Sequence, residues 1–470
     1  MNGTGSNSTF RVITAVITPY KKAPTRMLRT FIGELSGTMQ VVNSRLRRDL
    51  TMRSRVEKKF SMREVGDLLG LTKNYYESIL PKSAEEEESF PTGVRDGRER
   101  HYTLDELMLI RAHLQSLPNR RRPYLHWRQP GDPLKIVTFG AQKGGTGKSL
   151  SAAHFAQYLT MNYGLRVGLI DCDPQATASL YFADDESHLF DPEIATVAAF
   201  MGVSEPGETD LVTRPTAELD AMWQPTPWAG IRLIPGGSDI QNGDISLFLL
   251  AQRAQIPVHS VLKNAIERWD EEYGPKTRFA DLRRADGSFN LDRYTKALRE
   301  TVDVIVIDQQ PSLTLMQLNG LVAATSVIVP QTMKGFDLST LSTYSQNIAE
   351  YLDYIEETSA EAIGIGRHVV LPTIVQEAND KDVDQIVDLY QRAPELFLQV
   401  WYPRSDAVAN AAEEYKSIYE YDPPRSRRAS TKTFIDSANA VNDALVDVVW
   451  GSALPSRGYA RDFIKARWQE

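Results

Sequence analysis

The sequence predicts an α/β protein in which a parallel sheet, covered by helices on both faces, follows a smaller basic front. From Leu134 onward, short apolar runs alternate with stretches of helical pattern, as in parallel sheets that are buried on both sides. The charge divides near the same point. Residues 1–130 contain 23 Lys and Arg against 14 Asp and Glu, and residues 131–470 contain 30 against 47. We therefore expect N-terminal domains that face an acidic partner such as nucleic acid, joined to a large α/β domain.

The composition is that of a globular protein, with 470 residues, 42% of them hydrophobic and 24% charged. No apolar run approaches the ~20 residues that span a bilayer, and the start "MNGTGSNSTF" lacks the order of a secretory signal. We expect a cytoplasmic protein. The single cysteine, Cys172, excludes an intramolecular disulfide and a multi-cysteine cluster within one chain.

Residues 1–56 are expected to form a helical arm. Apolar residues recur there near helical spacing, at Met27, Leu28, Phe31, Leu35 and Met39. Such a helix either packs on its own domain or pairs with a second subunit.

Residues 57–116 are expected to form a winged helix-turn-helix domain. Ser61 and Glu64 can form a capping box for a first helix, Gly70 allows a turn, and a second helix begins after Thr72 and runs to about Leu80. In this outline the second helix enters a major groove with its first residues, which are Lys73, Asn74 and Tyr75. Two short capped helices also occur in many folds that do not bind DNA.

A basic, glycine-punctuated segment follows these two helices. Arg98 and Arg100 lie in it, before a helix that Thr103 and Glu106 can cap. Such a hairpin resembles a wing whose arginines hold phosphates, although a solvated loop would have the same composition. Residues 117–133 then contain four prolines and are expected to be a linker.

The stretch "IVTFGAQKGGTGKSLS", residues 136–151, has the features of a phosphate-binding loop. It follows an apolar strand and precedes a helix, and three glycines leave backbone N–H groups free to surround an anion. Lys148 supplies a positive charge to the outer phosphates, and Ser149 offers a hydroxyl to Mg²⁺. Lys143 is a second lysine that one such loop does not need.

The order K-G-G-T-G-K-S is the deviant Walker A motif, and here the sequence resembles the ParA/MinD class of P-loop ATPases. The resemblance implies that ATP joins two chains into a homodimer. In it Lys143 would cross to the phosphates bound by the partner, whereas Lys148 would act on its own nucleotide. The residues expected to contact ATP or ADP in the loop are Gly144, Gly145, Thr146, Gly147, Lys148, Ser149 and Leu150.

Two further segments match the class in the expected order. "DCDPQ" places Asp173 near the attacking water and the hydration shell of the metal, with Asp171 supporting it, and "VIVIDQQPSL" provides Asp308 for Mg²⁺. The metal set is therefore Ser149, Asp308 and Asp173. The family commonly has a prolyl pair after the aspartate that corresponds to Asp308, where this chain has Gln309 and Gln310. In relatives a later loop helps to hold adenine, which suggests Pro403 and Arg404.

The fold class is thus a parallel-sheet P-loop NTPase domain over residues 134–470, with an insertion around 181–300, preceded by the arm and the winged helix-turn-helix. This order resembles the long ParA proteins of plasmid partition. It implies ATP-dependent binding to nonspecific DNA, ATP hydrolysis stimulated by a ParB-type centromere-binding partner, ADP-favoured binding to the protein's own operator, and a nucleoid-associated location.

A second basic cluster could hold nonspecific DNA. It consists of Arg425, Arg427, Arg428 and Lys432, and its alternative is a solvated surface. Two other functions stay open. One is a MinD-like positioning ATPase that would use the tail "GYARDFIKARWQE" as an amphipathic membrane helix, and the other is a nucleotide-gated repressor with little ATPase activity.

Overall fold

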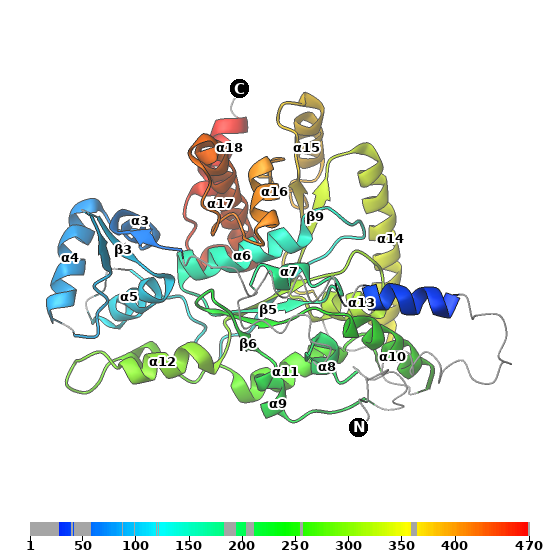
Figure 1. Ribbon diagram of the computed structural model, residues 1–470, viewed down its shortest axis with the longest axis horizontal. Helices are drawn as coiled ribbons and strands as arrows, with labels where there is room; N and C mark the ends of the chain where they lie inside the picture. Colours follow the sequence, from blue (N-terminus) through cyan, green and yellow to red (C-terminus); the bar gives the residue numbers. More distant parts are fainter. Residues whose placement is uncertain are drawn as a thin grey trace.

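The computed structural model describes residues 28–38, 41, 58–86, 88–97, 99–118, 120, 122–182, 194–203, 211–253, 257–358 and 364–468. Two sheets organise this part of the chain, one of three strands and one of seven. Figure 1 shows the small sheet with its helices at the left and the large sheet, between two layers of helices, in the centre.

The small sheet belongs to an N-terminal unit over residues 58–118. Its elements are β1 (Phe60–Ser61), α3 (Met62–Leu68), α4 (Lys73–Glu86), β2 (Val94–Asp96), β3 (Glu99–Tyr102) and α5 (Leu104–Ser116), with antiparallel strands in the order β1-β3-β2. Both expected capping boxes are confirmed, Ser61 with Glu64 and Thr103 with Glu106. Gly70 has φ 64° at the turn between α3 and α4, where a left-handed backbone favours glycine. Helix α4 continues past Leu80 through Pro81.

The large sheet confirms the predicted α/β class. Its order is β10-β9-β4-β8-β5-β7-β6, and every pairing is parallel except that of β6 with β7. The strands are β4 (Lys135–Phe139), β5 (Val167–Asp171), β6 (Gln224–Pro225), β7 (Ile231–Ile234), β8 (Val304–Asp308), β9 (Ser326–Thr332) and β10 (Val369–Thr373). The central strand β8 is buried along its whole length, as a strand covered on both faces must be.

Helices cover both faces of this sheet (Figure 1). One core includes α6 (Lys148–Tyr163), α16 (Asp406–Glu413), α17 (Arg428–Trp450) and α18 (Tyr459–Trp468). A second core joins α8 (Val197–Met201), α9 (Thr216–Ala221), α10 (Asp239–Arg253), α11 (Val261–Tyr273) and α13 (Leu315–Ala323). The remaining helices are α7 (Thr177–Leu180), α12 (Leu291–Glu300), α14 (Gly335–Thr358), α15 (Asp380–Arg392) and the short turns η1 (Phe279–Leu282), η2 (Arg425–Arg427) and η3 (Gly451–Ala453).

The stretch 181–300, expected as an insertion, contributes to the sheet as well as to its surroundings. β7 pairs with β5 in parallel, and α8, α10 and α11 cover one face of the sheet. Among the described residues of this stretch, η1 and α12 extend toward the N-terminal unit, where Phe289 stacks on His113 with ring centroids 3.7 Å apart. Strand β7 is only four residues long, so its signal is weak in the sequence.

Residues 122–133, within the expected linker, contain no helix or strand, as their prolines predict. They are nevertheless packed, because Tyr124, Leu125, Trp127 and Arg128 are buried. Arg128 binds both carboxylate oxygens of Asp270. The segment is therefore a packed connection between the N-terminal unit and the large α/β domain.

The two ends of the described chain differ in how they pack. Residues 28–38 form the expected helix, and its Leu28, Phe31 and Leu35 side chains are 57%, 60% and 46% exposed. In the C-terminal helix α18, Phe463 is buried and the indole of Trp468 donates to the carbonyl of Gln399 at 2.8 Å. The aromatic face of α18 is thus occupied by its own domain. Within the described residues, no helix is both long and apolar enough to cross a membrane.

Candidate functional site

The glycine-rich loop joins β4 to α6 and lies at the carboxyl edge of the large sheet. Gly145 and Gly147 have φ of 73° and 83°, a backbone that other residues adopt only with strain. Lys148 is the first residue of the 16-residue helix α6, so the loop ends at a helix N-terminus that favours anions. The hydroxyl of Thr373, from β10, donates to the carbonyl of Thr146 at 2.8 Å and fixes the loop against the sheet.

Lys148 points inward, and its side chain is covered by the loop. The residue is 6% exposed, and its ammonium donates to the carbonyl of Lys143 at 3.1 Å. Burial lowers the pKa of Lys148, while the charges of Asp308 and Asp173 raise it. This lysine therefore places a positive charge between the loop and two carboxylates, where an anion in the loop would meet it.

Asp308 ends β8 beside Asp171, with which it is paired in the parallel register of β5 and β8. Its carboxylate is fully buried, and neither oxygen makes a hydrogen bond of good geometry with a described residue. Burial raises the pKa of Asp308 well above its ordinary value, and Asp171 adds to the rise, whereas the hydroxyl of Ser149 and the charge of Lys148 oppose it. A buried carboxylate with unused oxygens beside a serine hydroxyl fits Mg²⁺, whose ligands are oxygens.

The two aspartates of the D-x-D segment are placed differently. Asp171 is buried and accepts from the backbone and hydroxyl of Ser179 at 2.8 and 2.7 Å and from the backbone of Asp173 at 3.0 Å. Burial raises the pKa of Asp171 to about 6 despite these bonds. Asp173 is 9% exposed and accepts from the backbone N–H of Gln175 at 2.9 Å. Asp171 thus organises the segment, and Asp173 faces the edge of the site.

Gly236 is a residue of this site that the sequence analysis missed. A Cβ atom at Gly236 would lie 2.5 Å from the carbonyl oxygen of Asp173 and 2.8 Å from Cγ of Asp171, so only glycine fits. Its backbone N–H donates to the hydroxyl of Ser179 at 2.9 Å. The signal in the sequence was the glycine pair that follows an apolar run, "IRLIPGG".

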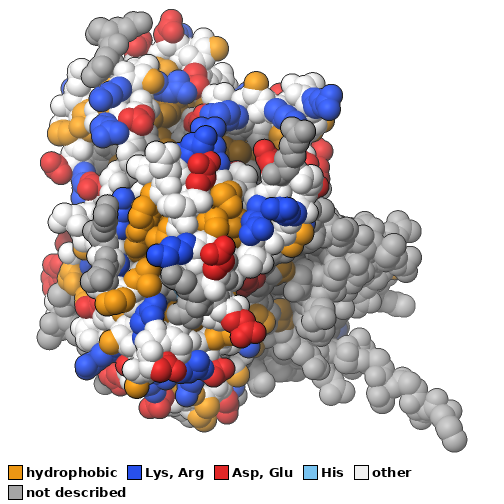
Figure 2. All heavy atoms as spheres, turned by 90° about the vertical axis from the view of Figure 1, so that its left-hand side faces the viewer, with side chains coloured by type: hydrophobic (Ala, Val, Ile, Leu, Met, Phe, Trp, Pro, Cys, Tyr) orange, Lys and Arg blue, Asp and Glu red, His pale blue; other side chains and the backbone are white. Residues whose placement is uncertain are grey.

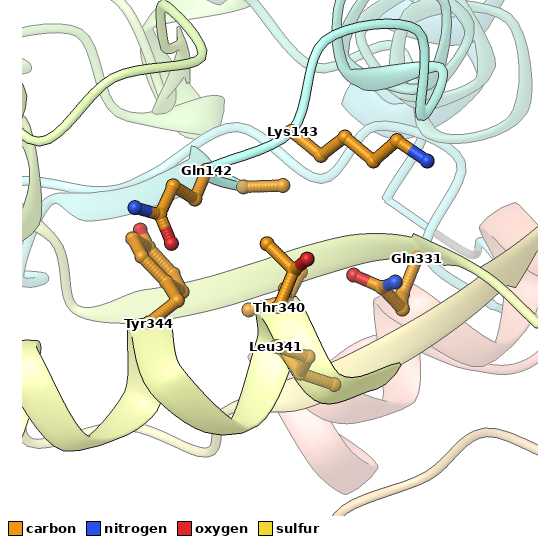
Figure 3. A pocket seen from close by; sticks show the side chains of 8 residues that line it. Gln142, Lys143, Gln331, Thr340, Leu341 and Tyr344 are labelled. Carbon is orange, nitrogen blue, oxygen red and sulfur yellow. The ribbon is translucent and has the colours of Figure 1, made fainter. Parts of the chain in front are cut away.

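Lys143 points away from Lys148 and out of its own loop. Its side chain is 46% exposed, and its ammonium is paired with the carboxylate of Asp337 in the first turn of α14. Figure 3 shows Lys143 and Gln142 above α14, where they line a pocket with Thr340 and Tyr344. Sequence reasoning did not find Asp337, because it stands 194 positions away.

The two glutamines after Asp308 have different surroundings. Gln309 is buried against Gly320 of α13. A Cβ atom at position 320 would overlap the side-chain amide of Gln309. Gln310 donates to the hydroxyl of Thr314, the N-cap of α13, at 2.7 Å. The segment is therefore connected to α13 by polar side chains, where the resembled family has prolines.

Pro403 and Arg404 lie on the same edge of the sheet as the loop. Thr373 of β10 binds the loop, and Val375 lies two residues after it. Val375 forms a parallel β-bridge with Pro403, and its carbonyl accepts from the backbone N–H of Arg404 at 2.8 Å. Pro403 is buried, and Arg404 is exposed.

The basic residues proposed for DNA lie in two separate parts of the chain. At the start of α4, Lys73 and Asn74 are exposed and Tyr75 is partly buried, while Arg100 on β3 is partly buried and Arg98 lies outside the described residues. Figure 2 shows the end of the molecule that carries the N-terminal unit, with Lys and Arg side chains around an apolar strip and Asp and Glu among them. The second cluster, at the start of α17, is exposed, and Lys432 is paired with Asp436 at 2.7 Å.

Known proteins resemble this chain in sequence and in fold. The family model described as the CobQ/CobB/MinD/ParA nucleotide binding domain matches residues 137–418. A protein of Sinorhizobium fredii named replication protein A is 25% identical over 406 residues, which cover 85% of this chain and 88% of that protein. The sporulation initiation inhibitor protein Soj of Bacillus subtilis is 24% identical and covers 65% of this chain and 98% of its own. A solved structure described as a partition protein has a TM-score of 0.51 at 19% identity and covers 82% of this chain and 96% of its own.

Proposed function

This chain belongs to the CobQ/CobB/MinD/ParA nucleotide-binding family, and on that premise we propose that it is a partition ATPase of the long ParA type. The observation that carries the proposal is the opposite direction of two lysines in one phosphate loop. Lys148 is buried toward its own carboxylates, and Lys143 extends outward from the same loop. One site on one chain can use only the first, so the second is suited to a nucleotide on another copy.

The nucleotide is ATP, held with Mg²⁺. ATP would supply the phosphoanhydride bond that is cleaved, and Mg²⁺ would supply a divalent charge that offsets the phosphates. The backbone of Gly144 to Leu150 surrounds the phosphates, and Lys148 neutralises their outer charge. Ser149 and Asp308 hold the metal side of the site. Pro403 and Arg404, at the same sheet edge, border the base.

Asp173 orients the water that attacks the outer phosphate. Its position supports this role, because it lies beside Asp171 at the strand ends but is not enclosed as Asp171 is. Asp171 fixes the turn through Ser179, and Asp173, which accepts from Gln175 through one oxygen, is placed to accept a hydrogen bond from water. Lys143 of a second chain adds a positive charge where negative charge develops, and hydrolysis therefore requires the homodimer.

The N-terminal unit is a winged helix-turn-helix that binds the protein's own operator, with preference for the ADP state. Its helix α4 presents Lys73 and Asn74 at an exposed N-terminal end, and the β2–β3 hairpin stands where a wing would. The cluster at the start of α17 holds nonspecific DNA in the ATP state. A ParB-type partner stimulates hydrolysis, and the protein is cytoplasmic and associated with the nucleoid.

The test is DNA-dependent ATP turnover by the purified full chain. We expect ATP to promote binding to random-sequence DNA, and that DNA to raise the hydrolysis rate. Footprinting of the upstream region of the gene should show protection mainly with ADP. If ATP leaves random DNA unbound and turnover unchanged while a footprint is present, the protein is a nucleotide-gated repressor and the partition proposal fails. Co-sedimentation with anionic liposomes would instead support the MinD-like function, which the packed face of α18 disfavours.

A further inference from the structure

Lys143, proposed above to act on another chain, is held by its own chain in this structure. Its ammonium is paired with one carboxylate oxygen of Asp337, and the hydroxyl of Thr332, at the end of β9, donates to the other. The Asp337 side chain is 5% exposed, whereas the Lys143 side chain is 46% exposed. The carboxylate is thus the fixed member of the pair and the lysine the movable one.

We infer that Asp337 is a positioning residue that stores Lys143 on its own chain and must release it before Lys143 reaches the phosphates of a partner subunit. The inference rests on the proposed function, because it takes the action of Lys143 across the dimer as given. One ammonium group on one side chain cannot contact Asp337 and a nucleotide on another chain at the same time. Storage and dimer closure therefore compete for the same group.

The surroundings of Asp337 allow it to lose the lysine and remain ionised. It lies in the first turn of the 24-residue helix α14, where the helix dipole favours an anion. The hydrogen bond from Thr332 stays in place when the lysine leaves, and Lys334 adds a nearby positive charge. These groups and Lys143 lower the pKa of Asp337 against the effect of its burial.

The pair lies on an outward face and not in the core. Phe336, the neighbour of Asp337, is 92% exposed, and Lys143 is half exposed. A partner that docks there brings a triphosphate whose negative charge Mg²⁺ and Lys148 offset only in part. The remaining charge competes with the single charge of Asp337 for the lysine. ADP, with one phosphate fewer, competes less well, so the stored state is favoured after hydrolysis.

The experiment measures the dissociation constant of the dimer by sedimentation equilibrium, with the full chain and a non-hydrolysable ATP analogue. Asp337→Asn removes the charge that stores the lysine and should tighten the dimer by about tenfold, while the affinity of the single chain for the analogue stays unchanged. Asp353→Asn is the matched control, since Asp353 is an exposed carboxylate on the same helix. Thr332→Val weakens one support of Asp337 and should give a smaller change in the same direction. The inference is overturned if the Asp337→Asn dimer is no tighter than the wild-type dimer. If Asp337→Asn proves less stable than the wild type, Thr332→Val decides, and the inference is overturned when that variant gives no tighter dimer either.

Lys143→Ala separates this inference from the function beneath it. If Lys143 acts across the dimer, Lys143→Ala abolishes dimerisation with the analogue, and the double variant with Asp337→Asn shows no gain. If Lys143→Ala forms the dimer normally, the proposed role of Lys143 fails and the storage inference fails with it. If Lys143→Ala loses the dimer and Asp337→Asn does not tighten it, only the storage inference is wrong.

Discussion

Arg111 of the N-terminal unit donates to the backbone carbonyl of Met161, near the end of the helix that begins at the phosphate loop, at 2.6 Å. The same guanidinium donates to the carbonyl of Leu68 at 2.9 Å and to that of Tyr124 at 3.0 Å. Arg111 is 1% exposed, and burial lowers its pKa well below the usual value. One side chain thus joins α3, the connecting segment and α6.

Arg111→Met should destabilise the junction between the N-terminal unit and α6. The change leaves three carbonyls without their donor, and each buried bond to a charged donor contributes roughly 1.5–3 kcal/mol. We expect the free energy of unfolding to fall by at least about 2 kcal/mol in urea denaturation, with faster proteolysis between residues 117 and 133. Arg120→Met, at an exposed position, is the control. Equal stability of the two variants would show that Arg111 does not hold the junction.

Lys148→Gln should abolish tight ATP binding. The backbone donors of the loop are neutral, so Lys148 is the positive charge within it that an anion meets on its own chain. Isothermal titration with Mg·ATP measures the loss, and circular dichroism checks that the variant is folded. Unchanged affinity would remove the phosphate-loop assignment.

Asp173→Ala should bind ATP normally but hydrolyse it slowly, since the residue is assigned to water and not to the phosphates. Mixing provides a second readout. In a heterodimer of Asp173→Ala and Lys143→Ala chains, one site has both its own Asp173 and the partner's Lys143 and should regain turnover. If mixed chains are as inactive as each variant alone, the action of Lys143 across the dimer is refuted.

Arg427→Ala together with Arg428→Ala should weaken binding to DNA of any sequence in the presence of ATP. Each lost phosphate contact lowers the slope of log K against log salt by ~0.9 on duplex DNA. ATP binding should be unaffected. The measurement is a salt titration with random DNA, and an unaltered slope would mark the cluster as a solvated surface.

His113 should make the protein less stable on the acid side. Burial lowers its pKa to about 4, whereas an unfolded histidine titrates near ~6.5. The unfolded state therefore takes up the proton first, and the contribution of neutral His113 is present above pH ~6.5 and is lost as the pH falls toward ~4. His113→Gln should flatten the decline in unfolding free energy by up to about 2 kcal/mol between pH 7 and pH 5. An unchanged decline in the His113→Gln variant would contradict the assignment.

Short-range patterns predicted the local parts of this protein well. The phosphate loop and both capping boxes depend on residues within a few positions of one another, so their spacing is visible in the sequence. The resemblance to the ParA/MinD class assigned Asp308 and Asp173 to one site, and both follow parallel strands whose carboxyl ends meet at one edge. The sequence did not show which side chains contact each other when they lie far apart along the chain.

Asp337, Gly236 and Arg111 are the clearest of those omissions. Asp337 is one of many acidic residues, and only the sheet order brings β9 and α14 beside the loop. Gly236 is required because Asp173 and Asp171 approach it from another strand. The prolines of residues 117–133 correctly predicted a segment without helix or strand, but they carry no information about the burial of Trp127 and Arg128 between them.

The junction between the N-terminal unit and α6 also sets an order of events during synthesis. The unit spans residues 58–118, but residues that are synthesised much later contact it, among them Met161, Phe289 and Arg457. The guanidinium of Arg457 bonds to Asn162 and lies near Gly70. Domains generally fold in the order in which they leave the ribosome. The unit therefore emerges and folds long before the surface that receives it exists. Until residue 457 has been made, it is exposed on the nascent chain beside ribosomal and messenger RNA, and docking becomes complete only in the last part of translation.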